Sequence, residues 1–236
     1  MTDLHTHILP GVDDGAKTPQ DSIAMLREQS LQGVDTVVLT PHFYPDREPL
    51  ERFLSRRAEG FEELEHAIMQ LPPEEQQLLP RRLLGAEVAY VPGLHDADGL
   101  RELCIGTTKH MLLELPFYPW DARLIRGLYD VLGNSGVTPV LAHMERYMMC
   151  QSKRLINEVL DLGLPVQIGI DMLKGVFSPS MHLLRKGRGH LLASDCHDLH
   201  SRRPALRSAM ELVAKKLGEE TVEDLIALAD HLAGVA

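Results

Sequence analysis

The chain contains 236 residues, of which 44% are hydrophobic and 25% are charged; this is the composition of an ordinary soluble globular protein and excludes a disordered chain. A chain of this length predicts one domain over residues 1–236. It has 24 lysines and arginines against 34 aspartates and glutamates, a net charge of −10, which argues against binding of nucleic acid but leaves room for a local phosphate site.

Short aliphatic or β-branched runs alternate along the chain with longer segments of helical periodicity. The runs predict strands at residues 2–5, 34–40, 82–88, 111–115, 137–143, 165–170 and 190–194. Helices are predicted at residues 18–33, 51–71, 122–132, 153–162, 179–185, 205–217 and 222–232. Thr18 and Thr221 are the expected N-caps of the first and last helices. Residues 72–77 are expected to form an exposed connection.

Strands that alternate with helices in this way indicate parallel βα units. Seven such strands predict an α/β fold, a small and distorted TIM-like barrel. The rival, an open doubly wound sheet, is disfavoured because no Gly-x-Gly-x-x-Gly follows the first strand. In barrels of this kind the functional groups lie at the carboxyl ends of the strands.

No apolar stretch approaches the about 20 residues of a membrane span. The residues after Met1 lack the basic and apolar segments of a signal peptide. Three cysteines, Cys104, Cys150 and Cys196, are irregularly spaced and do not make a disulfide framework. We therefore expect a cytoplasmic protein that does not insert into a membrane.

Histidines and acidic residues gather where the predicted strands end. His5 and His7 are two apart on one strand, so both imidazoles point to the same face. The remaining candidates are Asp14, His42, Glu87, Glu114, His143, Asp195 and His197. Four carboxylates at one mouth would repel each other, and each costs several kcal/mol to bury. Because Arg146 and Arg202 cannot neutralise all four carboxylates, we predict that divalent cations bind there. Imidazole and carboxylate ligands suit manganese, iron or zinc. Nine candidate ligands exceed what one ion needs and suggest two or three ions.

Several motifs carry a resemblance to a known family. They are Asp3-x-His-x-His7, Val12-Asp-Asp-Gly15, Thr40-Pro-His42, Gly85-Ala-Glu87, Glu114, His143-x-Glu-Arg146-Tyr, and Ser194-Asp-x-His197 followed by Arg202-Arg-Pro204. In this order, and over nearly the whole chain, they resemble the polymerase-and-histidinol-phosphatase (PHP) superfamily. The most similar branch is that of the bacterial tyrosine-protein phosphatases of capsule and exopolysaccharide synthesis.

The resemblance implies a distorted seven-stranded barrel, the PHP fold, with a manganese-dependent centre of two or three metals. By motif, the metal ligands are His5, His7, Asp14, His42, Glu87, Glu114, His143, Asp195 and His197. Arg146 and Arg202 match phosphate-binding arginines. Asp13 remains an alternative to Asp14, and Arg203 to Arg202. The sixth strand, with Gly169-Ile-Asp171, departs from related sequences, which are polar there, and leaves that side of the floor open.

The implied reaction is hydrolysis of phosphotyrosine by a metal-bound hydroxide, because metals lower the pKa of bound water from about 15.7 towards neutrality. Arg146 and Arg202 would hold the phosphoryl oxygens. His42, His197 or a metal-bound water could protonate the leaving group, and the sequence does not choose among them. The resemblance alone implies the substrate, the tyrosine-rich tail of a tyrosine autokinase of polysaccharide biosynthesis. It leaves the oligomeric state open.

Two other activities compete with this one. A histidinol-phosphate or other small phosphomonoester phosphatase of the same superfamily is the first. A non-catalytic metal-binding regulator of polysaccharide export is the second, although such a module need not keep nine coordinating groups together.

Cys196 and Arg202 formally fit the Cys-x5-Arg loop of thiolate tyrosine phosphatases. We reject that mechanism, because the segment has no glycine to ease the turn. Strand alternation also turns Cys196 away from Asp195 and His197. We expect it to pack as a small buried hydrophobic residue.

Aromatic residues follow two strand ends: Phe43, Tyr44, Phe117, Tyr118 and Trp120. They could line a slot for a substrate ring or pack beneath the rim loops.

Overall fold

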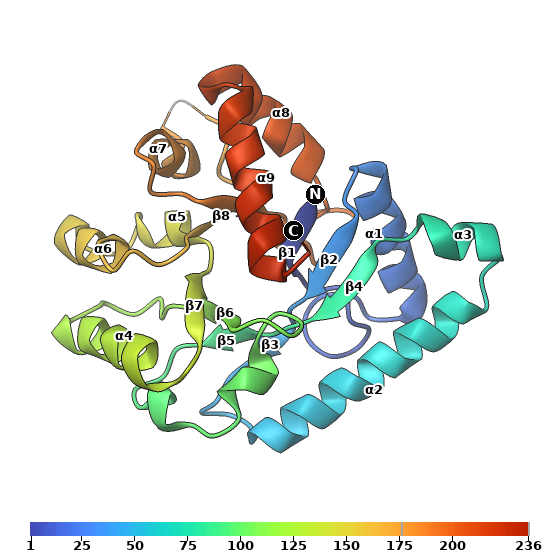
Figure 1. Ribbon diagram of the computed structural model, residues 1–236, viewed down its shortest axis with the longest axis horizontal. Coiled ribbons are helices and arrows are strands. Elements are labelled where there is room, and N and C mark those ends of the chain that lie inside the picture. The colour runs from blue at the N-terminus through green and yellow to red at the C-terminus, as the bar shows by residue number, and fades with distance from the viewer. Residues whose placement is uncertain (176, 236) are drawn as a thin grey trace.

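The computed structural model describes residues 1–175 and 177–235, and parallel strands form its centre (Figure 1). In chain order the strands are β1 (Thr2–Thr6), β2 (Thr36–Leu39), β3 (His42–Phe43), β4 (Arg81–Leu84), β5 (Glu87–Ala89), β6 (His110–Glu114), β7 (Thr138–Leu141), β8 (Gln167–Gly169) and β9 (Leu191–Ala193). Every pairing between these strands is parallel. The parallel arrangement is the one that the alternating pattern predicts.

The strands close into a barrel through short bridges between three sheets. The sheets have the orders β1-β2-β4, β3-β5-β6-β7 and β8-β9. A bridge from Leu141 to Val166 joins the second sheet to the third, and a bridge from Thr6 to Cys196 joins the third to the first. β3 continues β2, and β5 continues β4. Counting each of these pairs as one, the strands form seven staves, that is, seven positions around the barrel wall. The predicted distorted seven-stranded barrel is confirmed.

Two of the seven staves are broken, which the prediction of single strands at residues 34–40 and 82–88 did not foresee. The second stave breaks at Pro41, which has no N–H to donate to a ladder, and the third breaks at Gly85. Across the breaks the Glu87 N–H still donates to the Pro41 carbonyl, at 3.1 Å. Beyond them β3 and β5 pair so that His42 lies opposite Glu87.

Helices surround the barrel (Figure 1). They are α1 (Pro19–Leu31), α2 (Leu50–Met69), α3 (Pro73–Leu78), α4 (Ala122–Asn134), α5 (Met144–Tyr147), α6 (Lys153–Leu160), α7 (Pro179–Arg185), α8 (Leu206–Leu217) and α9 (Glu219–Ala233), with 3-10 turns η1 (Leu94–Asp96) and η2 (Leu100–Leu103). The predicted helices are confirmed, with differences at their ends. Thr18 caps α1 as expected and forms a capping box with Asp21.

Residues 72–77 connect α2 to β4 and none of them is buried, as predicted, but Pro73–Leu78 of this connection form the short helix α3. Pro73 stands at the first position of α3, where its fixed φ favours a helix and its missing N–H costs nothing. One prediction about a helix end is wrong. Thr221 does not cap the last helix, because α9 begins directly after Gly218 and the Thr221 hydroxyl donates to the Leu217 carbonyl instead.

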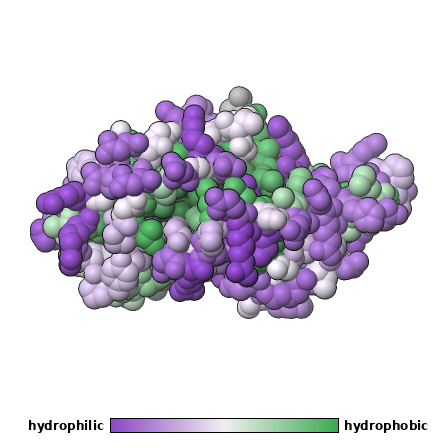
Figure 2. Space-filling view, turned by 90° about the horizontal axis from the view of Figure 1, so that it is seen from below, coloured by the Kyte–Doolittle hydropathy of each residue, from purple (hydrophilic) through white to green (hydrophobic). Residues whose placement is uncertain are grey.

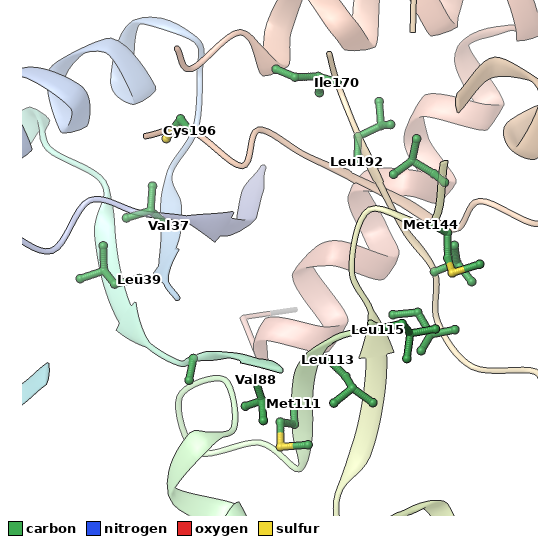
Figure 3. Close-up of a cluster of buried hydrophobic side chains, with 14 of the residues drawn as sticks. Val37, Leu39, Val88, Met111, Leu113, Leu115, Met144, Ile170, Leu192 and Cys196 are labelled. Carbon is green, nitrogen blue, oxygen red and sulfur yellow. The ribbon is translucent and has the colours of Figure 1, made fainter. Parts of the chain in front are cut away.

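Successive residues of β2, β6, β7 and β9 contribute to two separate hydrophobic clusters, as the two-residue period of a strand predicts. One cluster lies between strands and helices; Val37, Leu39, Val88, Met111, Leu113, Leu115, Met144, Ile170, Leu192 and Cys196 belong to it (Figure 3). The other fills the barrel itself, and Leu4, Val38, Leu112, Val140 and Leu191 belong to it.

Helix α9 closes the amino-terminal end of the barrel. Its Ala229 and Leu232 pack on the inner cluster. The Thr2 hydroxyl, at the start of β1, donates to Asp230 at 2.6 Å, and His110, at the start of β6, contacts the Leu232 carbonyl at 3.1 Å. The opposite, carboxyl end of the barrel is therefore the one left for polar groups.

The face shown in Figure 2 is largely hydrophilic, with hydrophobic atoms visible in a hollow among polar ones. Among the residues described, no helix combines the length and the apolar character that crossing a bilayer requires.

Candidate metal centre

His5, in β1, and His7, directly after β1, face each other at the carboxyl end of the barrel. Their Nε2 atoms lie 3.1 Å apart and both side chains are fully buried. His5 Nδ1 lies 3.3 Å from Gln167 Oε1, and His7 Nδ1 lies 2.7 Å from Asp13 Oδ2. Since both partners are acceptors, Nδ1 carries the proton on each ring and both Nε2 lone pairs point into the same space. Such a pair needs a cation or a proton between its nitrogens.

The neighbouring carboxylates favour positive charge in this space. Burial lowers the pKa of His7, but hydrogen bonds to Asp13, Asp195 and Glu87 outweigh burial and hold that pKa well above its usual range. His143 behaves alike: burial lowers its pKa, yet the hydrogen bonds to Glu114 and Glu87 raise it to about 9. Positive charge is thus favoured in this space, which is also what a metal ion would supply.

Two buried carboxylates form the acidic counterpart of these histidines. Glu87 Oε1 lies 2.8 Å from His143 Nε2, and Glu87 Oε2 lies 2.9 Å from His42 Nδ1. Burial raises the pKa of Glu87, but the charge of His5 and hydrogen bonds from neighbouring histidines hold it well below the usual value. Asp195 Oδ1 is buried, and only the imidazole nitrogens His5 Nε2 and His7 Nε2 approach it, each at 3.3 Å and without good hydrogen-bond geometry. A buried carboxylate oxygen without a well-aligned donor fits a cation ligand.

Asp14 and His197 complete the site at its open side. Asp14 Oδ1 lies 3.3 Å from His197 Nε2 and 3.4 Å from His42 Nε2. Gly15 makes this possible: a Cβ atom there would lie 2.0 Å from the His7 carbonyl oxygen. The structure thus brings Asp14 to the mouth and leaves Asp13 behind His7.

All nine predicted ligands come together in the structure. Ligand atoms of three groups lie within 4.8 Å of one another: His7, Asp14, His42 and His197; His5, His7 and Glu87; and His42, Glu87 and Glu114. His143 and Asp195 lie outside these groups but contact their members. Neighbouring ligands of an ion bound at about 2.1 Å lie about 3 Å apart, so the donor set and its spacing fit divalent ions.

Two of these residues have unfavourable backbone conformations. His143 has a φ of 32° and Asp195 a φ of 51°, and no other non-glycine residue within 1–175 and 177–235 has a positive φ. Each costs of order 1 kcal/mol or more. Strain confined to two strand ends indicates that these side chains are aimed for function.

Arg146 and Arg202 converge on one carboxylate. Both guanidinium groups donate to Asp195 Oδ2, Arg202 at 2.5 Å. Arg202 also donates to His197 Nε2 at 2.9 Å. Burial and the positive charges of His7 and Arg202 lower the pKa of His197 to about 4, so that its ring is neutral and accepts this bond. Arg203 lies away from Asp195, on the wall of a separate groove.

Gln167 is a site residue that the sequence analysis missed. It is fully buried on β8, and its Oε1 accepts from the His143 backbone N–H at 2.7 Å as well as from His5. It therefore supplies a polar group on the sixth strand of the barrel, the side of the floor that the sequence analysis left open. A lone amide side chain in the apolar run Val166-Gln-Ile was the signal.

Cys196 is fully buried in the outer hydrophobic cluster (Figure 3). Burial and the nearby negative charge of Asp3 raise the pKa of its thiol. The expected packing of Cys196 is confirmed, and the thiol has neither the exposure nor the charge of a nucleophile.

Comparisons with known proteins show the family of this chain. A family model described as capsular polysaccharide synthesis, CpsB/CapC, matches residues 1–231. The tyrosine-protein phosphatase CpsB of Streptococcus pneumoniae is 29% identical over 243 residues, which cover 95% of this chain and 94% of CpsB. The tyrosine-protein phosphatase YwqE of Bacillus subtilis (strain 168) is 29% identical over 228 residues, covering 93% and 86%.

A solved structure shows the same likeness in three dimensions. It comes from crystal structures of YwqE from Bacillus subtilis and CpsB from Streptococcus pneumoniae, described as unique metal-dependent tyrosine phosphatases. It matches with a TM-score of 0.83 and 27% identity, over 100% of this chain and 95% of the other. The resemblance to the capsule branch of tyrosine phosphatases is confirmed, and the chain belongs to the CpsB/CapC family of capsular polysaccharide synthesis.

Proposed function

We propose that residues 1–236 act as one metal-dependent tyrosine-protein phosphatase domain. The observation that carries the proposal is the meeting of nine imidazole and carboxylate groups with two arginines at one end of the barrel. Membership in the CpsB/CapC family and the names of the relatives support it.

The proposed ligands of two or three divalent ions are the nine groups named above. Manganese is the proposed metal, with iron and zinc as alternatives, because mixed nitrogen and oxygen donors suit all three. Ions held there would acidify a coordinated water and so supply the attacking oxygen at neutral pH.

Arg146 and Arg202 are the proposed phosphate-binding residues. Both guanidinium groups are partly exposed and share Asp195 Oδ2. A phosphate dianion would offer them three oxygens in place of one shared carboxylate oxygen, and the planar guanidinium fork fits such oxygens bidentately. The leaving phenolate has a conjugate-acid pKa of about 10, so it needs less protonation than an alkoxide. His42 and His197 stand at the open side of the site and are the proposed residues for handling this proton.

The proposed substrate is a phosphotyrosine protein of capsule synthesis, with the tail of a tyrosine autokinase as the finer proposal. The description of the family as capsular polysaccharide synthesis supports this substrate class.

Hydrolysis of three compounds tests the proposal: a phosphotyrosine peptide, p-nitrophenyl phosphate and histidinol phosphate. We expect turnover of the first two, its loss after chelation, and recovery with Mn²⁺ as the first metal tried. Faster turnover of histidinol phosphate would favour a small-molecule phosphatase. Metal uptake without any turnover would favour the non-catalytic regulator.

A further inference from the structure

An aromatic groove leads away from the metal centre. A cavity of about 570 Å³ is lined by Tyr44, Tyr90, Phe117 and Tyr118, and also by the candidate metal ligand Glu114. The chain has five phenylalanines and five tyrosines, so four of these ten rings line one cavity. A second cavity of about 330 Å³ shares Tyr90 and Tyr118 with it and extends the groove to the start of α4.

Two of the rings that line the groove, Phe117 and Tyr118, differ from the buried rings near them. Phe43 packs on Phe53 with ring centroids 4.8 Å apart, and Trp120 is buried against Tyr147. These two belong to the rim packing that the sequence allows. Phe117 and Tyr118, in contrast, are 52% and 59% exposed. Large exposed rings side by side at a cavity are typical of a binding surface.

The loop that presents Phe117 and Tyr118 is held in place. The Trp120 indole donates to the Pro116 carbonyl at 2.8 Å. Gln151 accepts from the Trp120 backbone N–H at 2.9 Å and donates to the Tyr118 carbonyl at 3.0 Å. Because its backbone is fixed on both sides, the loop exposes its two rings in a set position and would lose little entropy on binding a ligand.

A glycine in α4 makes room for Tyr90, another ring that lines the groove. Gly127 lies in the middle of α4, where a glycine destabilises a helix by about 1 kcal/mol relative to alanine. A Cβ atom at Gly127 would lie 1.8 Å from the Tyr90 hydroxyl oxygen. The glycine therefore lets the hydroxyl end of Tyr90 approach the helix closely, and Tyr90 lines both cavities.

The groove is continuous with the metal centre through stacked rings. The Tyr44 ring stacks on His42 at 5.4 Å between centroids, and the Phe117 ring stacks on His143 at 6.3 Å. The Arg47 guanidinium lies over the Tyr44 ring, 4.4 Å from its centroid. A tyrosyl phosphate bound at the ions would thus have its ring, and the chain that carries it, at the inner end of this groove.

We infer that the groove binds the polypeptide on either side of the phosphotyrosine and selects extended segments with apolar or aromatic neighbours. This inference rests on the proposed phosphatase activity and adds a substrate class to it. The proline and aromatic side chains of the groove contact apolar and aromatic neighbours well. The charged residues Asp46, Arg47 and Glu114 line the same cavity, so the inferred selectivity rests on the exposed rings of Phe117 and Tyr118.

The test compares kcat/KM for p-nitrophenyl phosphate with kcat/KM for two phosphotyrosine peptides of equal net charge. One peptide has leucine and phenylalanine beside the phosphotyrosine, and the other has serine and glycine. We expect the metal-loaded protein to prefer the apolar peptide. The readout is the kcat/KM for the apolar peptide divided by the kcat/KM for p-nitrophenyl phosphate. Tyr118→Ala and Gly127→Ala should each lower this ratio about tenfold, the size expected for a central binding residue.

Two variants on the same helix serve as controls. Gly133→Ala adds a methyl group that meets nothing within 4 Å, and Tyr129→Ala removes a ring that is exposed outside the groove. Both should keep the ratio of the parent protein. If Gly127→Ala fails to fold, the surface variant Tyr118→Ala carries the test.

An unchanged ratio in Tyr118→Ala, or equal turnover of both peptides, would overturn the inference. So would a change of oligomeric state in Tyr118→Ala with no change of ratio, which would make the groove a contact between copies of the chain. Anisotropy of the labelled apolar peptide separates the two proposals. If no phosphate ester is hydrolysed but the peptide binds and Tyr118→Ala weakens binding, the groove stands and the proposed function fails.

Discussion

The two ends of the barrel are built from the same strands but are opposite in chemistry. At the amino-terminal end Leu4 and Leu112 fill the interior and α9 covers them. At the carboxyl end, one residue along β1 from Leu4, His5 begins a buried cluster of imidazoles and carboxylates. Each buried leucine favours folding by about 1.5–3 kcal/mol, whereas buried carboxylates and strained residues such as Asp195 oppose it.

The contrast teaches that stability and chemistry are divided along the barrel axis. A substitution at the inner apolar end should change the free energy of unfolding and spare the chemistry. A substitution at the metal end should do the reverse. Four variants can break or sharpen this division.

The largest effect is expected for Leu112→Ala at the apolar end. Leu112 is fully buried in the inner cluster, so its loss leaves a cavity and should lower the free energy of unfolding by about 2–5 kcal/mol. Urea denaturation measures this, with the exposed Leu78→Ala as control. Metal content and kcat per folded molecule should not change; a loss of either would show that the two ends are coupled.

Arg146→Ala is expected to act next most strongly, on catalysis alone. By analogy with removal of one donor to a developing negative charge, kcat should fall about 100-fold to 1,000-fold. Unfolding and metal content should match the parent protein. Arg203→Ala, a neighbouring arginine on a different groove, is the control. If Arg203→Ala proves the more damaging of the two arginine variants, the proposed phosphate site is misassigned.

Gln167→Leu should lower the affinity for metal ions without leaving a cavity in the core. The substitution removes the acceptor of His5 Nδ1 and of the His143 N–H. Groups that orient ligands in this way typically contribute 10-fold to 100-fold to metal affinity, so a loss of about that size is expected. Competition with a chelator of known affinity measures it. If the variant keeps the metal affinity of the parent protein but has a lower free energy of unfolding, Gln167 contributes to stability and not to metal binding.

Cys196→Ser is the smallest change, and it tests the rejected mechanism. The Cys196 side chain lies in the outer hydrophobic cluster, with Gln29 Nε2 at 3.5 Å from its sulfur. A hydroxyl can accept the same contact, so phosphatase activity should stay close to that of the parent. His42→Ala in the same assay should lose most of it. The opposite pattern would make the thiol the nucleophile after all.

Much of the fold was predictable because strand alternation is a local property. Apolar runs and helical periods located the seven staves, and the two-residue period correctly placed His5 with His7 and turned Cys196 away from Asp195. Predictions at element ends were weaker. The start of α9 at Glu219 depends on how neighbouring segments pack, whereas the break at Pro41 follows from the missing N–H of proline, a local signal that the prediction of a single strand overlooked.

The site was predictable as a set of residue types, but not as an arrangement. Residue order could not choose between Asp13 and Asp14; the close approach of Gly15 to the His7 carbonyl brings Asp14 to the mouth. Nor could it show that Gln167 contacts His5, because the two are 162 residues apart in the chain.

Residue chemistry and local periodicity were enough to indicate a parallel barrel with a cation-binding end, because both act over a few positions of the chain. Closure of the barrel then set which groups meet. It joined the first strand to the last, placed His42 opposite Glu87, and turned both arginines onto Asp195. Such contacts depend on the register of strands that are far apart in sequence, and no local pattern records that register.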